Sequence, residues 1–244
     1  MMKSNIEYRD ITSKNTEVIS QVVETHRFPQ LNCRSWRLAV ETNNIRDWTK
    51  VPTHCLKYVS YYMLGKQYRL ECEAVANAAI EYAKSIKVGP HDVWIFDIDE
   101  TALSNLPYFS RPDVDFGACP YNETLANEWD SAGKAPAIPA VLEVYKTVVS
   151  LGINPVFLSG SSQKYRAVRK ANLIEAGYTS WILLILKEDN DTRSAVEFKT
   201  SWIKSLITSE YRIVGNIGDQ WSDLIGENPG ARTFKVPNPM YYIA

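Results

Sequence analysis

From residue 91 onward, short strand-forming runs alternate with amphipathic helical segments. The strand-forming runs occupy residues 92–97, 154–160, 180–186, 211–219 and 231–237. The helical patterns occupy residues 138–152, 161–178 and 199–209. Strands that alternate with helices form a parallel sheet with helices on both faces and right-handed crossovers. We therefore predict an α/β fold, a three-layer sandwich around a central parallel sheet.

The first 90 residues show a helical pattern instead, with no clear pair of strands. Apolar residues recur at helical spacing within residues 53–86, with Thr53 as the predicted N-cap and Gly65 as a predicted bend. We predict that residues 1–90 form a helical extension, which packs on a core of residues 91–244.

One stretch of this core, at about residues 104–137, does not fit the alternation. It is too long for an ordinary connection and too rich in Pro, Gly and aromatic residues for one helix. Long insertions in α/β enzymes are usually lids or binding loops, so we predict a small cap. Its aromatic side chains either stack on a substrate or form the core of the cap, and the second interpretation is favoured. They are Tyr108, Phe109, Phe116, Tyr121 and Trp129.

The run "VWIF" at residues 93–96 has the composition of a buried strand and ends at two carboxylates, Asp97 and Asp99, with Thr101 close behind. Ligands of open parallel sheets bind beyond the carboxyl ends of the strands. Two carboxylates this close repel each other unless a cation compensates, most simply a divalent cation with oxygen ligands. The sequence therefore predicts a metal site here; the simpler alternative is that both residues cap the next turn.

Three other segments place polar residues at the same edge of the predicted sheet. Ser159 and Gly160 end a strand before a predicted helix, where a hydroxyl and free N–H groups bind anions. Lys199 lies at the start of a predicted helix. Asp219 and Asp223 follow another strand and share one face if a helix begins at that turn, so that both can point at a metal. Each segment alone has an ordinary structural reading, a helix cap or a solvated charge.

Composition excludes several other classes of function. The formal net charge of −1 offers no electrostatic footprint for nucleic acid or an anionic membrane. No stretch approaches the roughly 18 apolar residues of a membrane helix, and no phosphate-binding GxxxxGK[ST] loop occurs. We therefore expect a small-molecule partner, with neither nucleic acid nor membrane as a partner.

Histidine and cysteine do not form a recognisable metal motif. His26, His54 and His91 fall outside every segment described above, which argues against a histidine phosphatase. The four cysteines lack zinc-finger spacing. They are either four buried thiols or include one disulfide in the N-terminal half, and both alternatives stay open.

In this order, the four segments resemble the motifs of the haloacid dehalogenase (HAD) superfamily of phosphotransferases. The first motif, Asp-x-Asp-x-Thr after a strand, is matched by "VWIFDIDET"; Ser159, Lys199 and "GDQWSD" match the second, third and fourth. Longer stretches, "NCRSWRLAVETNNIRDWTKVPTHC" and the tail "RTFKVPNPMYYIA", look like the plant acid phosphatase and vegetative storage protein family. The resemblance implies a HAD-like Rossmannoid fold.

The same resemblance implies a mechanism. Asp97 would form an aspartyl-phosphate, and Asp99 would protonate the leaving alcohol and later deprotonate water. Ser159, Gly160 and Lys199 would bind the phosphoryl oxygens.

The resemblance also implies a cofactor. Mg²⁺ would be held by Asp97, the backbone carbonyl of Asp99 and Asp219, with Asp223 as a direct or outer ligand.

The chain departs from the family pattern at a few positions. Ser161 stands where an arginine is expected after "LSG", and Trp202 and Ile203 stand where charges are expected after Lys199. We expect these changes to alter the phosphate-side surface or the choice of substrate more than the chemistry. Lys187 is a second candidate for the lysine of the third motif.

We predict a Mg²⁺-dependent acid phosphatase with an acidic pH optimum; the alternative is a vegetative storage protein with little activity. Storage members can lack the nucleophilic aspartate, and the presence of Asp97 favours an enzyme. The resemblance implies a vacuolar or secreted protein, whereas the polar residues 1–15 lack the apolar core of a signal peptide, which leaves a cytoplasmic location open. The oligomeric state is open as well, a homodimer included.

Overall fold

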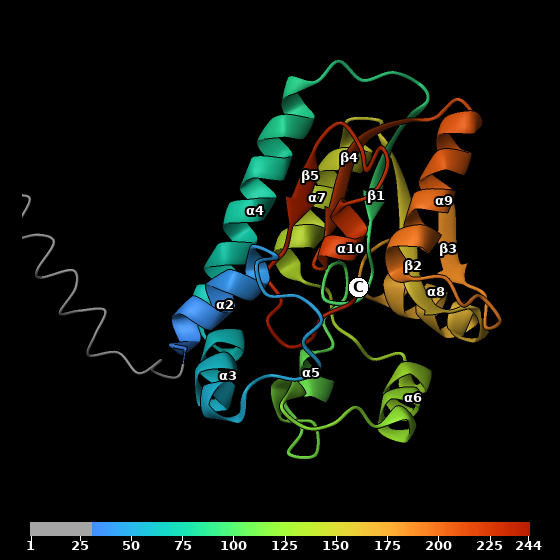
Figure 1. Cartoon of the computed structure of the whole chain (residues 1–244). Helices are drawn as coiled ribbons and strands as arrows, with labels where there is room; N and C mark the ends of the chain where they lie inside the picture. Colours follow the sequence, from blue (N-terminus) through green and yellow to red (C-terminus); the bar gives the residue numbers. More distant parts are fainter. Residues whose placement is uncertain (1–30) are drawn as a thin grey trace, which may run out of the picture.

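The computed structural model describes residues 31–244 (Figure 1). Predictions that fall on residues 1–30, His26 among them, lie outside the described residues. Within residues 31–244, no helix has both the length and the apolar character that a membrane span requires.

Five parallel strands form the centre of the molecule, in the order β3-β2-β1-β4-β5. Their bounds are Asp92–Phe96 for β1, Asn154–Ser162 for β2, Leu183–Lys187 for β3, Arg212–Gly218 for β4 and Thr233–Lys235 for β5. All five residues of β1 are buried, because this central strand is covered on both faces. The predicted α/β fold with a parallel sheet is confirmed.

Helices cover both faces of the sheet, which makes three layers (Figure 1). Trp94 and Phe96 of β1 belong to the larger apolar core, which they share with α4 (Lys66–Ser85) and α7 (Pro139–Ser150). Val93 and Ile95 point to the other face, into a smaller core beneath α9 (Ala195–Thr208). This alternation follows from the two-residue period of a strand. Helix α8 (Arg166–Glu175) lies between β2 and β3 along the chain.

The N-terminal helices are α2 (Cys33–Glu41), the 3-10 turn η1 (Thr53–Cys55), α3 (Leu56–Leu64) and α4. Gly65 joins α3 to α4, and a Cβ there would lie 2.4 Å from the carbonyl oxygen of Tyr61. The predicted bend at Gly65 is therefore confirmed. Thr53 is not an N-cap: it is the first residue of η1, and Pro52 precedes it, because the chain makes a 3-10 turn before α3 begins.

The N-terminal helices share their core with the sheet. Trp36 of α2 and Val59 of α3 belong to the same apolar cluster as Trp94 of β1. A disulfide between Cys33 and Cys55 links α2 to η1. Of the two alternatives left open for the cysteines, the one with a single disulfide in the N-terminal half is therefore correct. The division of the chain near residue 90 stays a prediction.

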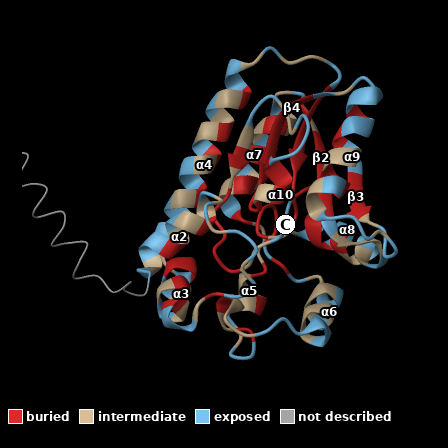
Figure 2. Cartoon of the chain, in the orientation of Figure 1, coloured by how far each residue is buried: buried red, intermediate tan, exposed pale blue. Residues whose placement is uncertain are grey.

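The segment at about residues 104–137 lies beyond the carboxyl ends of the strands (Figure 1). It contains α5 (Leu106–Phe109), the turn η2 (Asp115–Gly117) and α6 (Glu123–Ala132). The two ends of the segment are joined, because the N–H of Ser104 donates to the carbonyl of Pro136 at 2.8 Å. Figure 2 shows exposed and half-buried residues on α6, in contrast to the buried strands. We refer to this segment as the cap.

Candidate active site

Three carboxylates meet where two neighbouring strands end. Asp97 follows β1, Asp219 follows β4, and Asp223 lies on α10 (Trp221–Leu224). The register pairs Phe96 with Ile217, so the ends of the two strands lie side by side. One oxygen from each carboxylate lies within 4.8 Å of the others, and all three residues are buried.

A shared helix face does not bring Asp219 and Asp223 together. The helix begins at Trp221, so Asp219 lies in the turn before it. Asp223 is the third residue of α10 and accepts a hydrogen bond from the N–H of Gln220 at 2.9 Å, as in a capping box. Asp219 and Asp223 are therefore close together as predicted, but the turn between β4 and α10 brings them together and a shared helix face does not.

Lys199 is the cation beside this cluster. It is buried on α9, and its Nζ lies 2.5 Å from Asp97 Oδ1 and also contacts Asp223 Oδ1. When all three carboxylates are ionised, the single ammonium leaves two excess negative charges. Burial first, and then the charge of Asp223, raise the pKa of Asp219 to about 6. Burial also raises the pKa of Asp97, although Lys199 opposes that shift. A buried oxygen cluster with this excess charge suits a divalent cation.

Asp219 is oriented by residues from three parts of the chain. Its Oδ1 accepts from the hydroxyl of Thr101 at 3.2 Å. Its Oδ2 accepts from the side-chain amides of Gln220 and Asn238, each at 2.7 Å. Sequence reasoning named neither amide. Gln220 is the next residue of the same segment, whereas nothing in the local pattern links Asn238 of the C-terminal tail to this aspartate.

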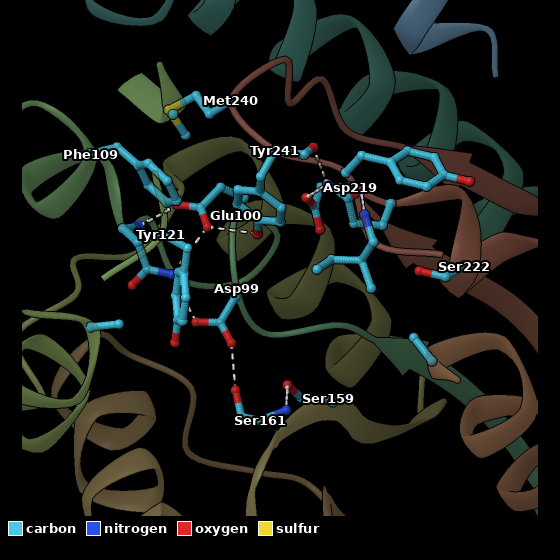
Figure 3. A pocket seen from close by; sticks show the side chains of 18 of the residues that line it. Asp99, Glu100, Phe109, Tyr121, Ser159, Ser161, Asp219, Ser222, Met240 and Tyr241 are labelled. Atoms are coloured by element: carbon cyan, nitrogen blue, oxygen red, sulfur yellow. Dashed lines mark hydrogen bonds between the residues drawn. The ribbon is translucent and has the colours of Figure 1, made fainter. Parts of the chain in front are cut away.

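The carboxylate of Asp99 does not belong to the three-carboxylate cluster and points toward Ser161 (Figure 3). Its Oδ2 accepts from the Ser161 hydroxyl at 2.6 Å, and its Oδ1 lies 2.9 Å from Arg169 Nη1 and 2.8 Å from Asn105 Nδ2. Burial alone would raise its pKa, but Arg169, Ser161 and Asn105 hold the pKa of this carboxyl below its usual range. Ser161, at the position where the resemblance led us to expect arginine, thus contacts Asp99 directly.

Ser159 and Gly160 lie on β2, which flanks β1 on the side opposite to β4, and they line the same cavity as Asp97. Strand β2 has a register irregularity between Ser159 and Ser162, and the N–H of Ser161 donates to Ser159 Oγ at 3.0 Å. The helix expected directly after this strand is delayed, because a 3-10 turn (Gln163–Tyr165) comes first. A helix N-terminus therefore does not open at Ser159.

The C-terminal tail closes one side of the cavity. The hydroxyl of Tyr241 donates to Glu100 Oε2 at 2.9 Å, and the N–H of Ile243 donates to Gln220 Oε1 at 3.0 Å. Burial and the neighbouring charge of Asp99 raise the pKa of Glu100 to about 8. Sequence reasoning missed Glu100, although it lies inside the first motif.

The cavity has a volume of about 890 Å³ and separates the strand ends from the cap. Four of the five cap aromatic residues line it, whereas Phe116 is buried in the large core. Tyr108 stacks on Trp129, and Phe109 stacks on Tyr241, so these rings already contact protein neighbours. Tyr121 is 78% exposed.

The remaining sequence candidates lie in different places. Lys187 lines the cavity, where its Nζ donates to the carbonyl of Arg193. Ile203 is buried in the core beneath α9, and Trp202 is partly exposed. Neither residue is among the described residues that line the cavity, so the departures from the family pattern at these two positions do not change its lining.

Comparison with known proteins places these features in context. The family model of the HAD superfamily, subfamily IIIB (acid phosphatase), matches residues 19–244. Acid phosphatase 1 of Solanum lycopersicum is 43% identical over 217 residues, which cover 88% of this chain and 84% of that protein. The stem 28 kDa glycoprotein of Glycine max is 46% identical over 220 residues, covering 89% and 86%. Vegetative storage protein 2 of Arabidopsis thaliana is 41% identical over 216 residues, covering 87% and 80%.

A solved structure also has the same fold. The class C acid phosphatase of Bacillus anthracis superposes with a TM-score of 0.61 at 21% identity, over 78% of this chain and 85% of that one. At this level of identity, the likeness concerns the fold alone.

Proposed function

The chain belongs to the acid phosphatases of subfamily IIIB of the HAD superfamily, and we propose that it hydrolyses small phosphate monoesters through a covalent aspartyl-phosphate on Asp97. Membership of this family confirms the resemblance seen in the motifs. The observation that carries the proposal is the position of Asp97: it lies at the end of the central strand, beside Lys199 and within the cavity that Asp99 also lines.

The first step forms a bond between a carboxylate oxygen of Asp97 and phosphorus and breaks the bond from phosphorus to the ester oxygen. The strand fixes Asp97, whose N–H donates to the carbonyl of Ile217 at 3.0 Å, so little orientation is lost in the attack. Lys199 contacts Asp97 directly, so its ammonium is within reach of a phosphoryl group bound there. Ser159 and Gly160 bind phosphoryl oxygens on the opposite side.

Asp99 moves the protons. In the first step Asp99 must carry a proton, which its lowered pKa allows only at acidic pH, and this proton passes to the departing alkoxide, which leaves as a neutral alcohol. In the second step Asp99 takes a proton from water as the water oxygen attacks phosphorus, and the bond from phosphorus to Asp97 breaks. Inorganic phosphate leaves and both carboxyl groups return to their starting states. Dividing one displacement into two in this way lowers the barrier of each.

Asp97, the backbone carbonyl of Asp99, Asp219 and Asp223 are the groups that would hold Mg²⁺. The excess of two negative charges and the oxygen ligands suit this cation. Bound by these groups, Mg²⁺ would offset the repulsion between carboxylate and phosphate.

A storage role with little activity is the second candidate, because two relatives are named vegetative storage proteins. An enzymatic function is favoured over storage because Lys199 contacts Asp97 and because Arg169 holds Asp99.

The test is to trap the phosphoenzyme. Wild-type protein is mixed with Mg²⁺ and radiolabelled phosphate ester, quenched in acid and digested. We expect acid-stable label on the peptide that contains Asp97, and we expect Asp97→Asn to lose both the label and turnover of p-nitrophenyl phosphate. Label on another residue, or robust turnover by folded Asp97→Asn, would exclude Asp97 as the nucleophile; wild-type protein that is inactive on a panel of esters would favour storage.

A further inference from the structure

One face of α8 and the turn before it contacts the cap. Tyr165, Arg169 and Asn172 follow the i, i+4, i+7 spacing of a single helix face. Each makes a hydrogen bond or ion pair to the C-terminal part of the cap, and the three partners follow one another in the same order along the chain. The pairs are Tyr165 with Asn127 at 2.6 Å, Arg169 with Asp130 at 2.8 Å, and Asn172 with Ala135 at 2.8 and 3.1 Å.

Arg169 differs from the other two because it also contacts the candidate acid–base residue. Its Nη1 lies 2.9 Å from Asp99 Oδ1, and its Nη2 lies 2.8 Å from Asp130 Oδ1 on α6. The residue is 4% exposed. The rigid fork of a guanidinium holds two carboxylates in a defined relation, which a flexible ammonium does not. The position of Asp130 on α6 is thereby linked to the position of Asp99.

A second donor to the same oxygen leads back to the same helix. Asn105 donates to Asp99 Oδ1 at 2.8 Å, and its own Oδ1 accepts from Trp129 Nε1 at 2.7 Å. Trp129 and Asp130 are consecutive residues of α6. Both donors to this oxygen are thus held by one short stretch of the cap, whereas Ser161 on β2 holds the other oxygen.

We propose that Arg169 is a positioning residue, which couples the seating of cap helix α6 to the orientation of Asp99. The proposal rests on the acid–base role of Asp99 given above. Arg169 acts through Asp99 and does not itself transfer a proton. Its contribution is greatest for esters whose alcohol leaves poorly, because those need a well-placed acid, and smallest for esters whose anion leaves unaided.

The experiment compares kcat/KM for phenyl phosphate and 2,4-dinitrophenyl phosphate, since the second ester has a leaving group that needs no proton. Asp99→Asn defines the full loss of the acid. We expect Arg169→Met to lose on the order of 10²-fold with phenyl phosphate and less than about threefold with the dinitrophenyl ester. Asp130→Ala, which changes a partly exposed side chain, loses about tenfold with the same selectivity.

Tyr165→Phe is the matched control, because it removes a cap contact without touching Asp99. Any loss it causes is expected to be equal for the two esters. Circular dichroism checks that each variant is folded; if Arg169→Met does not fold, Arg169→Lys and Asp130→Ala decide the matter.

Equal losses on both esters, or no loss, in the folded Arg169 and Asp130 variants overturn the coupling. If Asp99→Asn itself shows no selectivity between the esters, the acid role of Asp99 is wrong and the coupling is wrong with it. A selective Asp99→Asn beside unselective Arg169 and Asp130 variants rejects the coupling alone and leaves the proposed reaction in place.

Discussion

Gly218 ends β4 and lies against the side chain of Asp223, and we predict that Gly218→Ala damages the site more than the fold. A Cβ at this position would lie 2.4 Å from Asp223 Oδ2 and 2.5 Å from its Cβ. Ordinary contact begins at 3.4 Å, so Asp223 must move by 3.4 − 2.4, about 1.0 Å. That shift breaks its hydrogen bond with the N–H of Gln220, now 2.9 Å, and moves it relative to Lys199.

Two magnitudes follow from this displacement. Overpacking and the lost cap together cost about 2–4 kcal/mol of unfolding free energy. A displacement of about 1 Å at a reacting site costs on the order of 10²-fold in kcat/KM. The Mg²⁺ concentration for half-maximal activity is expected to rise as well, because Asp223 belongs to the carboxylate cluster.

The assay is p-nitrophenyl phosphate hydrolysis over a Mg²⁺ series, with urea unfolding of the same preparation. Gly89→Ala is the control: its Cβ meets nothing closer than 3.6 Å, and we expect unchanged kcat/KM and a stability change below about 1 kcal/mol. A folded Gly218→Ala protein with wild-type kcat/KM and wild-type Mg²⁺ dependence would refute the placement of Asp223 in the working site.

Three further outcomes test the fold and the cofactor. Gly215→Ala should lower the unfolding free energy by about 3 kcal/mol in urea titrations, because its Cβ would lie 2.4 Å from the ring of buried Trp94; wild-type stability would contradict that packing. Activity should fall to background in EDTA and return on addition of Mg²⁺, as steady-state assays can measure; full activity in EDTA would argue against a metal. Arg212 holds the pKa of Asp92 below its usual range, so this pair stabilises the protein above the ordinary carboxyl pKa and stops doing so as the pH falls through the lower folded-state value. Asp92→Asn should therefore destabilise the protein at pH 7 and much less in strong acid, by urea titration at both pH values; an equal loss at both would show that charge is not the cause.

Local pattern was enough to predict the sheet and the position of its polar edge. The apolar run that ends at Asp97 has to be a buried strand, because such a run has no polar face to turn towards water. The alternation of strands and helices then leaves few topologies. Gly65 could be predicted as a bend for a similarly local reason.

Partners that are distant in sequence could not be predicted in this way. Asn238 reaches Asp219 from the tail, and Asn105 reaches Asp99 from the first turn of the cap. Neither residue type is unusual in its own segment, and an amide is as common in a loop as in a site. The helix expected directly after Ser159 is delayed for a comparable reason. The register irregularity in β2 and the 3-10 turn after it depend on how β2 pairs with β3, and the local pattern carries no sign of that pairing.

The sequence by itself determined that carboxylates collect at the end of a buried strand, since burial and the two-residue strand period are local properties. Tertiary structure alone decided which partners they have: the packing of α9 brings Lys199 to Asp97, and the packing of α8 against the cap brings Arg169 to Asp99. These contacts depend on how helices lie against the sheet, and that arrangement is set by the whole core at once.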